Sequence, residues 1–191
     1  MAASALHGRR FFFTLKQAFV LLTVLLLFRL SSGASTVNDV ILEVCNYTTR
    51  HYDLCVSALS SDPNSLTADR HALAGIALDL SLLNASDSVL FIAKLASEAK
   101  NEKHHGVFKT CLDFYNQTVV LHIIKAEENF HVQDYDNTIG ELSYCIGYSQ
   151  MCGEELKKLP FPGETPLQGR TEVQINLCEI TQILMTLLRY Y

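Results

Sequence analysis

Apolar residues recur at helical spacing in four long segments, and this pattern restricts the fold more than any other feature of the sequence. The segments run from about 67 to 100, 107 to 129, 134 to 158 and 171 to 191. Residues three and four positions apart form an apolar stripe along one side of each segment. No β-type alternation of any length competes with this pattern. The sequence therefore predicts an all-α protein built around an up-down four-helix bundle.

Polar and proline-rich stretches mark the expected ends of these helices. "SSDPNS" precedes the first helix, while "NEKHHG" and "HVQDYDN" are expected to break the chain on either side of the second. The prolines of "LPFPGETPLQG" should end the third helix. The expected core stripes are Leu73, Ile76, Leu80 and Leu83; Cys111, Phe114, Thr118 and Leu121, widened by Phe108, Tyr115, Val119 and His122; Tyr135, Ile139, Leu142, Ile146 and Ser149; and Val173, Leu177, Ile180, Leu184 and Leu187.

The first 34 residues have the pattern of a secretory leader. Arg9 and Arg10 precede an apolar run from 18 to 28, and the small residues Ser32 and Ala34 follow it. The uninterrupted run is about half the ~20 residues that a spanning helix needs. We expect cleavage near Ala34, with an uncleaved anchor starting near Phe11 as the alternative. No later segment is expected to span a bilayer, so no membrane association is expected after cleavage.

The charge of the remaining chain argues against nucleic acid as a partner. Residues 35–191 carry 11 Lys and Arg against 20 Asp and Glu, a net charge of −9. Nucleic-acid binding needs a basic surface to meet phosphates, and none is evident in this sequence. A cationic protein surface suits the acidic chain better, although acidity also simply keeps a secreted protein in solution.

All six cysteines lie beyond the leader, which makes disulfides the expected state of a secreted chain. Six thiols allow 15 pairings, and the absence of Cys-x-x-Cys argues against a zinc or thioredoxin-like site. Three sequons, beginning at Asn46, Asn84 and Asn116, are candidate glycosylation sites.

The residues around the cysteines resemble those of the plant invertase and pectin methylesterase inhibitor family. The opening "CNYTTRHYDLCVSALSSDPNSLTADRHALAGIALDL" supplies the first cysteine pair, the "SDP" element and a helix that starts near an aspartate. "FKTCLDFYNQTV", "DYDNTIGELSYCIGYSQMC" and "INLCEITQILMTLL" continue the likeness along the rest of the chain. The matching residues are Cys45, Tyr52, Cys55, Leu59, Ser61, Asp62, Pro63, Asp69, Leu73, Ala74, Cys111, Tyr115, Cys152 and Cys178.

The resemblance implies a single inhibitor domain over residues 35–191, with a disulfide-clasped helical hairpin before the bundle. It also implies the pairs Cys45–Cys55 and Cys111–Cys152. Cys145 stands where similar proteins usually carry a small residue. Together with Cys178, it is expected to be either a free buried thiol, which we favour slightly, or part of a third bridge.

The resemblance further implies a secreted, non-catalytic inhibitor that needs no cofactor and blocks its target one to one. Asp134, Tyr135 and Asp136 form a "DYD" element where invertase inhibitors typically carry "PKF", so pectin methylesterase in the cell wall is the favoured target. Acid invertase, in the cell wall or vacuole, is the alternative. A secreted helical protein without an enzyme target is the remoter reading.

Enzyme and metal readings find little support in the sequence. There is no Gly-x-Ser-x-Gly elbow or phosphate-binding glycine loop. Glu102-x-x-His105 and Glu128-x-x-His131 match the Glu-x-x-His signature of di-iron bundles, but both fall near expected helix ends, so no metal is expected. His122 is interpreted as a core-edge residue. Tyr135, Tyr144 and Tyr148 are candidate interface anchors or packing residues.

Overall fold

The computed structural model describes residues 37–160 and 166–190, which form helices joined by short turns and contain no β-strand. The leader predicted over residues 1–34 lies outside this part of the chain. The elements are α2 (Asp39–Asn46), η1 (Thr49–His51), α3 (Tyr52–Ser60), η2 (Pro63–Thr67), α4 (Arg70–Glu98), α5 (Glu102–Phe114), the π-helical η3 (Tyr115–Val119), α6 (Val120–His131), α7 (Tyr135–Leu156) and α8 (Pro166–Tyr190). This confirms the predicted all-α class.

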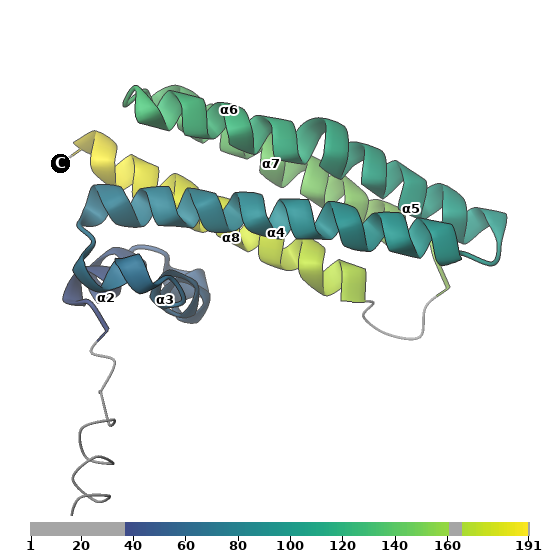
Figure 1. Cartoon of the computed structure of the whole chain (residues 1–191), viewed down its shortest axis with the longest axis horizontal. Coiled ribbons are helices and arrows are strands. Elements are labelled where there is room, and N and C mark those ends of the chain that lie inside the picture. The colour runs from purple at the N-terminus through teal and green to yellow at the C-terminus, as the bar shows by residue number, and fades with distance from the viewer. Residues whose placement is uncertain (1–36, 161–165, 191) are drawn as a thin grey trace, which may run out of the picture. The chain divides into compact units, whose positions relative to one another are not determined.

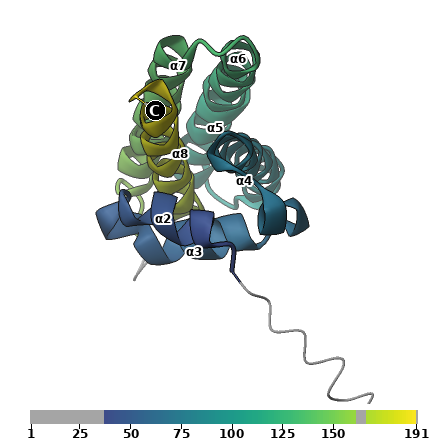
Figure 2. The same ribbon diagram turned by 90° about the vertical axis from the view of Figure 1, so that its left-hand side faces the viewer.

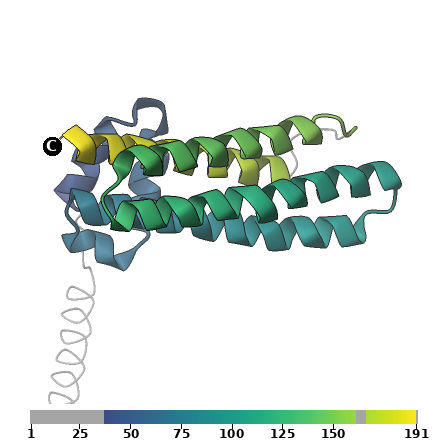
Figure 3. The ribbon, with the colours of Figure 1, turned by 90° about the horizontal axis from the view of Figure 1, so that it is seen from above.

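The long helices form the up-down bundle that the sequence predicted (Figure 1). α5, η3 and α6 run on from one another as a single rod, so the bundle has four members. α4 packs against α8 and against the α5–α6 rod, and α7 packs against the same two neighbours from the opposite corner. The end-on view of Figure 2 shows this square arrangement, and the view from above in Figure 3 shows the long helices lying lengthwise beside one another.

The N-terminal hairpin, α2 with α3, lies across the bundle on the side of α4 and α8 (Figure 2). Asn38 fixes its start, because its side chain accepts from Val40 N at 3.0 Å and donates to the carbonyls of Ser65 and Ala68, each at 2.8 Å. Those two carbonyls belong to the turn that leads into α4. One asparagine therefore caps α2 and ties the hairpin to the bundle.

Side-chain caps set where the long helices begin. Asp69 accepts from Ala72 N and Asn101 from His104 N, both at 2.8 Å. The Asn101 cap corrects one prediction, because "EKHHG" forms the first turns of α5 instead of a polar break. α8 also begins earlier than predicted. Pro166 starts it, since proline suits a first helical turn in which the missing N–H has no partner to lose.

The buried stripe of α4 consists largely of small residues, which allows its neighbours to approach closely. Past Leu78 it continues through Ser81, Ala85, Ser88, Ile92 and Ala96. The larger Leu83 and Leu90 instead point outward, with 62% and 71% of their surfaces exposed. The prediction that Leu83 lies in the core is therefore wrong, because polar and small residues occupy the buried positions.

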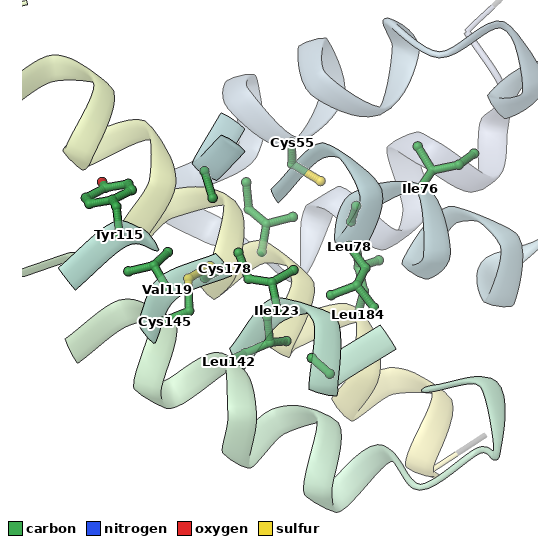
Figure 4. Packing of buried hydrophobic residues seen from close by; sticks show 14 of the residues in the cluster. Cys55, Ile76, Leu78, Tyr115, Val119, Ile123, Leu142, Cys145, Cys178 and Leu184 are labelled. Atoms are coloured by element: carbon green, nitrogen blue, oxygen red, sulfur yellow. A yellow bond between two sulfur atoms is a disulfide. The ribbon is translucent and has the colours of Figure 1, made fainter. Parts of the chain in front are cut away.

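The π-turn η3 keeps one face of the α5–α6 rod in the core. Its buried residues Cys111, Tyr115, Val119 and Ile123 are spaced by fours (Figure 4). An α-helix would rotate such a stripe by about 40° at each step. The wider π-turn absorbs this drift. Leu121, expected in the core stripe, is consequently exposed, whereas Phe108, Tyr115 and Val119, expected only to widen the buried face, are buried.

Three disulfides join described cysteines. Two are the pairs implied by the resemblance: Cys45–Cys55 closes the hairpin, and Cys111–Cys152 ties α5 to α7. The third, Cys145–Cys178, ties α7 to α8, so the preference for free thiols at these positions is wrong. Both sulfurs lie at the centre of the core among Val119, Ile123 and Leu142 (Figure 4).

α4 is long and apolar enough to cross a membrane by length and composition alone, and no other helix among the described residues is. The expectation that no segment after the leader has this character is therefore wrong. In the structure, α4 is a bundle member with its small-residue stripe buried, as expected for the core helix of a folded domain.

Candidate functional site

The predicted interface element, Asp134 to Asp136, spans the end of the turn after α6 and the first turn of α7. Gln133 adopts a positive φ of 59°, and the N–H groups of Gln133 and Asp134 bond back to Phe130 O and Asn129 O, each at 2.9 Å. This is a Schellman ending of α6 with glutamine where glycine is usual. Asp134 then caps α7, accepting from Asn137 N at 3.2 Å. The turn is thus fixed at both ends.

The three residues of this element have different environments. Asp134 is committed to the cap, and the half-buried Tyr135 packs near Phe130 and His71, with ring centroids 6.3 and 6.4 Å apart. Asp136 is the most available, with 68% of its side chain exposed, although its Oδ1 accepts from Arg189 Nη1 at 2.6 Å. Only Asp136 therefore presents its side chain mainly to solvent.

A larger surface lies further along α7, where it meets the α5–α6 rod. Phe114 and Tyr148 meet edge to face with ring centroids 5.7 Å apart, and His122 stacks on Tyr144 at 4.5 Å and 20° between planes. Met151 follows Tyr148 by three positions on α7, and Glu141 precedes Tyr144 by three. We call Phe114, His122, Glu141, Tyr144, Tyr148 and Met151 the aromatic face.

The aromatic face combines exposure with fixed side-chain positions. Tyr144 is 55% exposed and Met151 48% exposed, while Phe114, His122 and Tyr148 are half-buried. His122 Nδ1 is hydrogen-bonded to the Glu141 carboxylate. The imidazole ring that stacks on Tyr144 is therefore itself held in place. Large rings that are held rigidly lose little entropy on binding, which is why tyrosine is common at the centres of interfaces.

Sequence reasoning predicts part of this face. Tyr144 and Tyr148 are among the candidate anchors, and both lie on α7 four positions apart, which corresponds to about 6 Å along the axis of an α-helix. His122 is expected at the edge of the core, and its half-buried position agrees with that. Phe114 is assigned to the core by the sequence. In the structure it is half-buried at the edge of the core, and its contact with Tyr148 of α7 leaves no signal in the local sequence pattern.

A polar hollow lies between the hairpin, α7 and α8. It is lined by Arg50, His51, Gln150, Glu172, Ile175, Asn176 and Glu179. Glu179 Oε2 accepts from Arg50 Nη2 at 2.7 Å, and His51 Nε2 lies 2.6 Å from the same oxygen. These contacts attach the disulfide-closed loop of the hairpin to α8, so the hollow's charged groups are largely engaged with one another.

Two carboxyl groups between α4 and α6 have perturbed titration. Burial and the neighbouring Asp62 raise the pKa of Asp79, and burial together with Asp79 raises the pKa of Glu127. The nearby His131 lowers both pKa values and so opposes these shifts. In the core, burial raises the pKa of the Tyr115 hydroxyl, which lies 3.3 Å from Thr171 Oγ1.

The two Glu-x-x-His patterns do not converge. Glu102 and His105 lie in the first turn of α5, where His105 Nδ1 is 2.9 Å from Ala96 O, and Glu128 and His131 lie at the end of α6. Among residues 37–160 and 166–190, no group of three or more His, Cys, Asp or Glu side chains is placed to hold a metal.

The sequon asparagines lie on three different elements. Asn46 is exposed at the end of α2, and Asn116 is exposed in η3. Asn84 is half-buried in the middle of α4, where its Nδ2 donates to Gln174 Oε1 at 2.7 Å.

A disulfide-braced bundle that holds a row of aromatic side chains rigidly at its surface has the features of a protein-binding module. Comparison with known proteins gives the family. A sequence model of the plant invertase/pectin methylesterase inhibitors matches residues 39–185, and the chain belongs to this family. The members of this family are described as inhibitors of enzymes and not as enzymes.

Relatives named for both kinds of target are found. Pectinesterase inhibitor 28 of Oryza sativa subsp. japonica is 31% identical over 154 residues, which are 75% of this chain and just under two thirds, 66%, of the rice protein. A pectinesterase inhibitor of Actinidia deliciosa is 26% identical over 88% of this chain and 91% of its own length. The cell wall/vacuolar inhibitor of fructosidase 2 of Arabidopsis thaliana is 37% identical over 87 residues, 45% of this chain and 48% of its own.

The fold also matches a solved structure. The crystal structure of mutant form A of a pectin methylesterase inhibitor from Arabidopsis superposes with a TM-score of 0.66 over 75% of this chain and 93% of that one. The two sequences are 17% identical over the match, so this similarity supports the fold alone.

Proposed function

We propose that this protein is secreted and inhibits pectin methylesterase by covering the enzyme's active-site cleft with its aromatic face. The observation that carries the proposal is the exposed Tyr144, stacked on a His122 that Glu141 holds in place. A rigid aromatic anchor on a disulfide-braced scaffold suits occlusion, because little freedom is lost on docking. The complex is non-covalent and one to one, burying on the order of 1,600 Å² in total.

The choice of pectin methylesterase rests on sequence. Two relatives that match most of this chain are named for pectinesterase. Asp134, Tyr135 and Asp136 also stand where invertase inhibitors typically carry a "PKF" element with a lysine. This chain therefore has no cation at that position to meet the acidic catalytic cleft of an invertase. Acid invertase is the second candidate, because the relative named for fructosidase inhibition has the highest identity of the three, over a shorter match.

The leader-like residues 1–34 and the three disulfides support a secretory route. We place the mature protein in the cell wall if the target is pectin methylesterase. A vacuolar location would fit invertase instead.

Replacement of Tyr144 by alanine tests the docking face. We expect the inhibition constant against pectin methylesterase to rise by roughly thirtyfold, since truncating an interface anchor costs about 2 kcal/mol. The measurement is inhibitor titration of pectin methylesterase and of acid invertase, with circular dichroism to show that the fold is kept.

Leu90→Ala is the matched control. Leu90 is an exposed apolar residue on α4, outside the aromatic face, so its loss should leave inhibition unchanged. Equal inhibition by wild type and Tyr144→Ala would remove the aromatic face from the proposal. Inhibition of invertase but not of pectin methylesterase by the wild-type protein would reassign the target.

A further inference from the structure

We propose that Asn116 carries an N-linked glycan in the secreted protein and that Asn84, although it begins a sequon, does not. The proposal rests on the secretory route of the proposed function. All three sequons have the same local pattern, so the sequence gives no reason to prefer one. The surroundings of the asparagine side chains in the folded protein separate them.

Asn116 has room for a glycan. Its side chain is exposed, between the buried Tyr115 and the exposed Gln117 of η3. Because Tyr115 and Val119 point into the core, a sugar attached at Asn116 projects into solvent. No hydrogen bond within the described residues holds the Asn116 amide, so attachment disrupts none there.

A glycan at Asn116 also leaves the aromatic face open. Phe114, which packs on Tyr148 of α7, precedes Asn116 by two positions. Two residues correspond to roughly 160° to 200° around the helix, depending on how wide the turn is. Asn116 therefore lies on the side of the rod away from the contact with α7, and the glycan shields a surface that the proposed inhibition does not use.

Asn84 is in the opposite situation. Its half-buried Nδ2, the atom that would bear the sugar, lies 2.7 Å from Oε1 of Gln174. Gln174 is completely buried, and its Nε2 faces the sulfurs of Cys178 and Cys145 at 3.3 and 3.6 Å. A glycan on Asn84 would have to draw the amide out of the contact between α4 and α8. Gln174 Oε1 would then be buried without a partner, a state that folded proteins avoid.

The test is site-resolved mass spectrometry of the full-length chain expressed in a mammalian secretory host. Enzymatic deglycosylation in H₂¹⁸O converts a glycosylated asparagine to ¹⁸O-labelled aspartate. We expect the label at Asn116 and unmodified asparagine at position 84. An unlabelled Asn116, or a labelled residue 84, in protein recovered from medium or cells would overturn the proposal. The status of Asn46 does not affect this reading, because each peptide is scored separately.

Asn116→Gln separates this proposal from the proposed function. We expect it to abolish the label and to leave the inhibition constant within about twofold of wild type, which by the affinity relation is under 0.5 kcal/mol. A tenfold change would show that the glycan side takes part in docking, and would contradict the placement of Asn116 away from the contact with α7. Labelled Asn116 in a protein that inhibits neither enzyme would leave the glycan site standing while the proposed function fails.

Discussion

At the scale of single residues, Gln174 shows how a polar side chain is accommodated in this core. It lies fully buried on α8, whereas the sequence pattern predicts that its neighbour Val173 is the buried residue. Val173 is exposed instead. The glutamine is acceptable there because Asn84 donates to its oxygen and two sulfurs lie beside its nitrogen. A stripe read from apolar residues alone cannot detect such a partnership, since the two side chains are 90 residues apart in sequence.

The carboxyl groups between α4 and α6 predict how one residue affects stability with pH. The pKa of Glu127 is raised in the folded state above its ordinary 4.5, so ionisation is easier after unfolding. Its stabilising contribution is therefore complete below pH 4.5 and is lost as the pH rises through the folded pKa. Glu127→Gln removes that loss. We expect a higher melting temperature than wild type at pH 7 and no gain at pH 4, measured by circular dichroism.

Glu128→Gln is the control for this substitution, because Glu128 is the next residue on α6 and is exposed. Asp62, Asp79 and His131 face the same region and stay unchanged in both variants. The interpretation is wrong if Glu127→Gln shifts the melting temperature equally at both pH values, or if Glu128→Gln produces the same pH-dependent gain.

At the scale of the elements, helical periodicity was enough to predict the four bundle members and their order, because each carries a stripe of apolar residues. Boundaries were less certain. The sequence places Asn101 and Pro166 in breaks, yet Asn101 caps α5 and Pro166 begins α8, since a cap and a first-turn proline look like turn formers in sequence.

The candidate site is harder to predict from the sequence than the fold is. Tyr144 and Tyr148 could be named as anchors from residue type, but their partners Phe114 and His122 come from a different helix. The π-turn η3, which follows Phe114, has no signal in local helix propensity, so the sequence pattern does not predict it. The assignment of Asp134 to the interface stays a prediction, and in the structure its side chain caps α7.

The disulfide between α7 and α8 gives a prediction at this scale. The double variant Cys145→Ala/Cys178→Ala opens a link that spans 33 residues. Loop-closure entropy for that length corresponds to about 4 kcal/mol, so we expect the free energy of unfolding to fall by roughly that amount. The measurement is urea unfolding followed by circular dichroism.

Cys45→Ala/Cys55→Ala, which opens a link of only 10 residues, provides the comparison. A smaller loss is expected from it, because the loop-closure term grows with length. If the α7–α8 pair were removed without any change in the urea midpoint, the link would contribute nothing to stability.

At the scale of the whole molecule, net charge bears on how the inhibitor meets its target. Residues 37–191 carry 11 basic and 20 acidic side chains, a net charge of −9. Opposite charge on the enzyme would speed encounter, and dissolved salt would screen it. We expect the inhibition constant against pectin methylesterase to increase several-fold between low and high ionic strength, as measured in titrations at fixed pH.

The association rate should account for most of that increase, because long-range charge acts mainly on encounter. A stopped-flow or biosensor measurement at the same salt concentrations distinguishes the two rate constants. An inhibition constant that does not vary with salt would show that charge has no part in recognition.

The order of the sulfur links along the chain has a mechanical consequence. Cys145 lies before Cys152 in sequence, so the loops closed by Cys111–Cys152 and Cys145–Cys178 overlap. The shortest covalent path from Cys111 to Cys178 therefore runs through only the six residues between Cys145 and Cys152. Under tension applied at its two ends, the oxidised polypeptide cannot unravel the helices enclosed there. With the hairpin link included, its extended length is shorter than that of the reduced polypeptide by about 220 Å. Reduction of the disulfides would therefore allow this part of the chain, which resists extension when oxidised, to extend fully under tension.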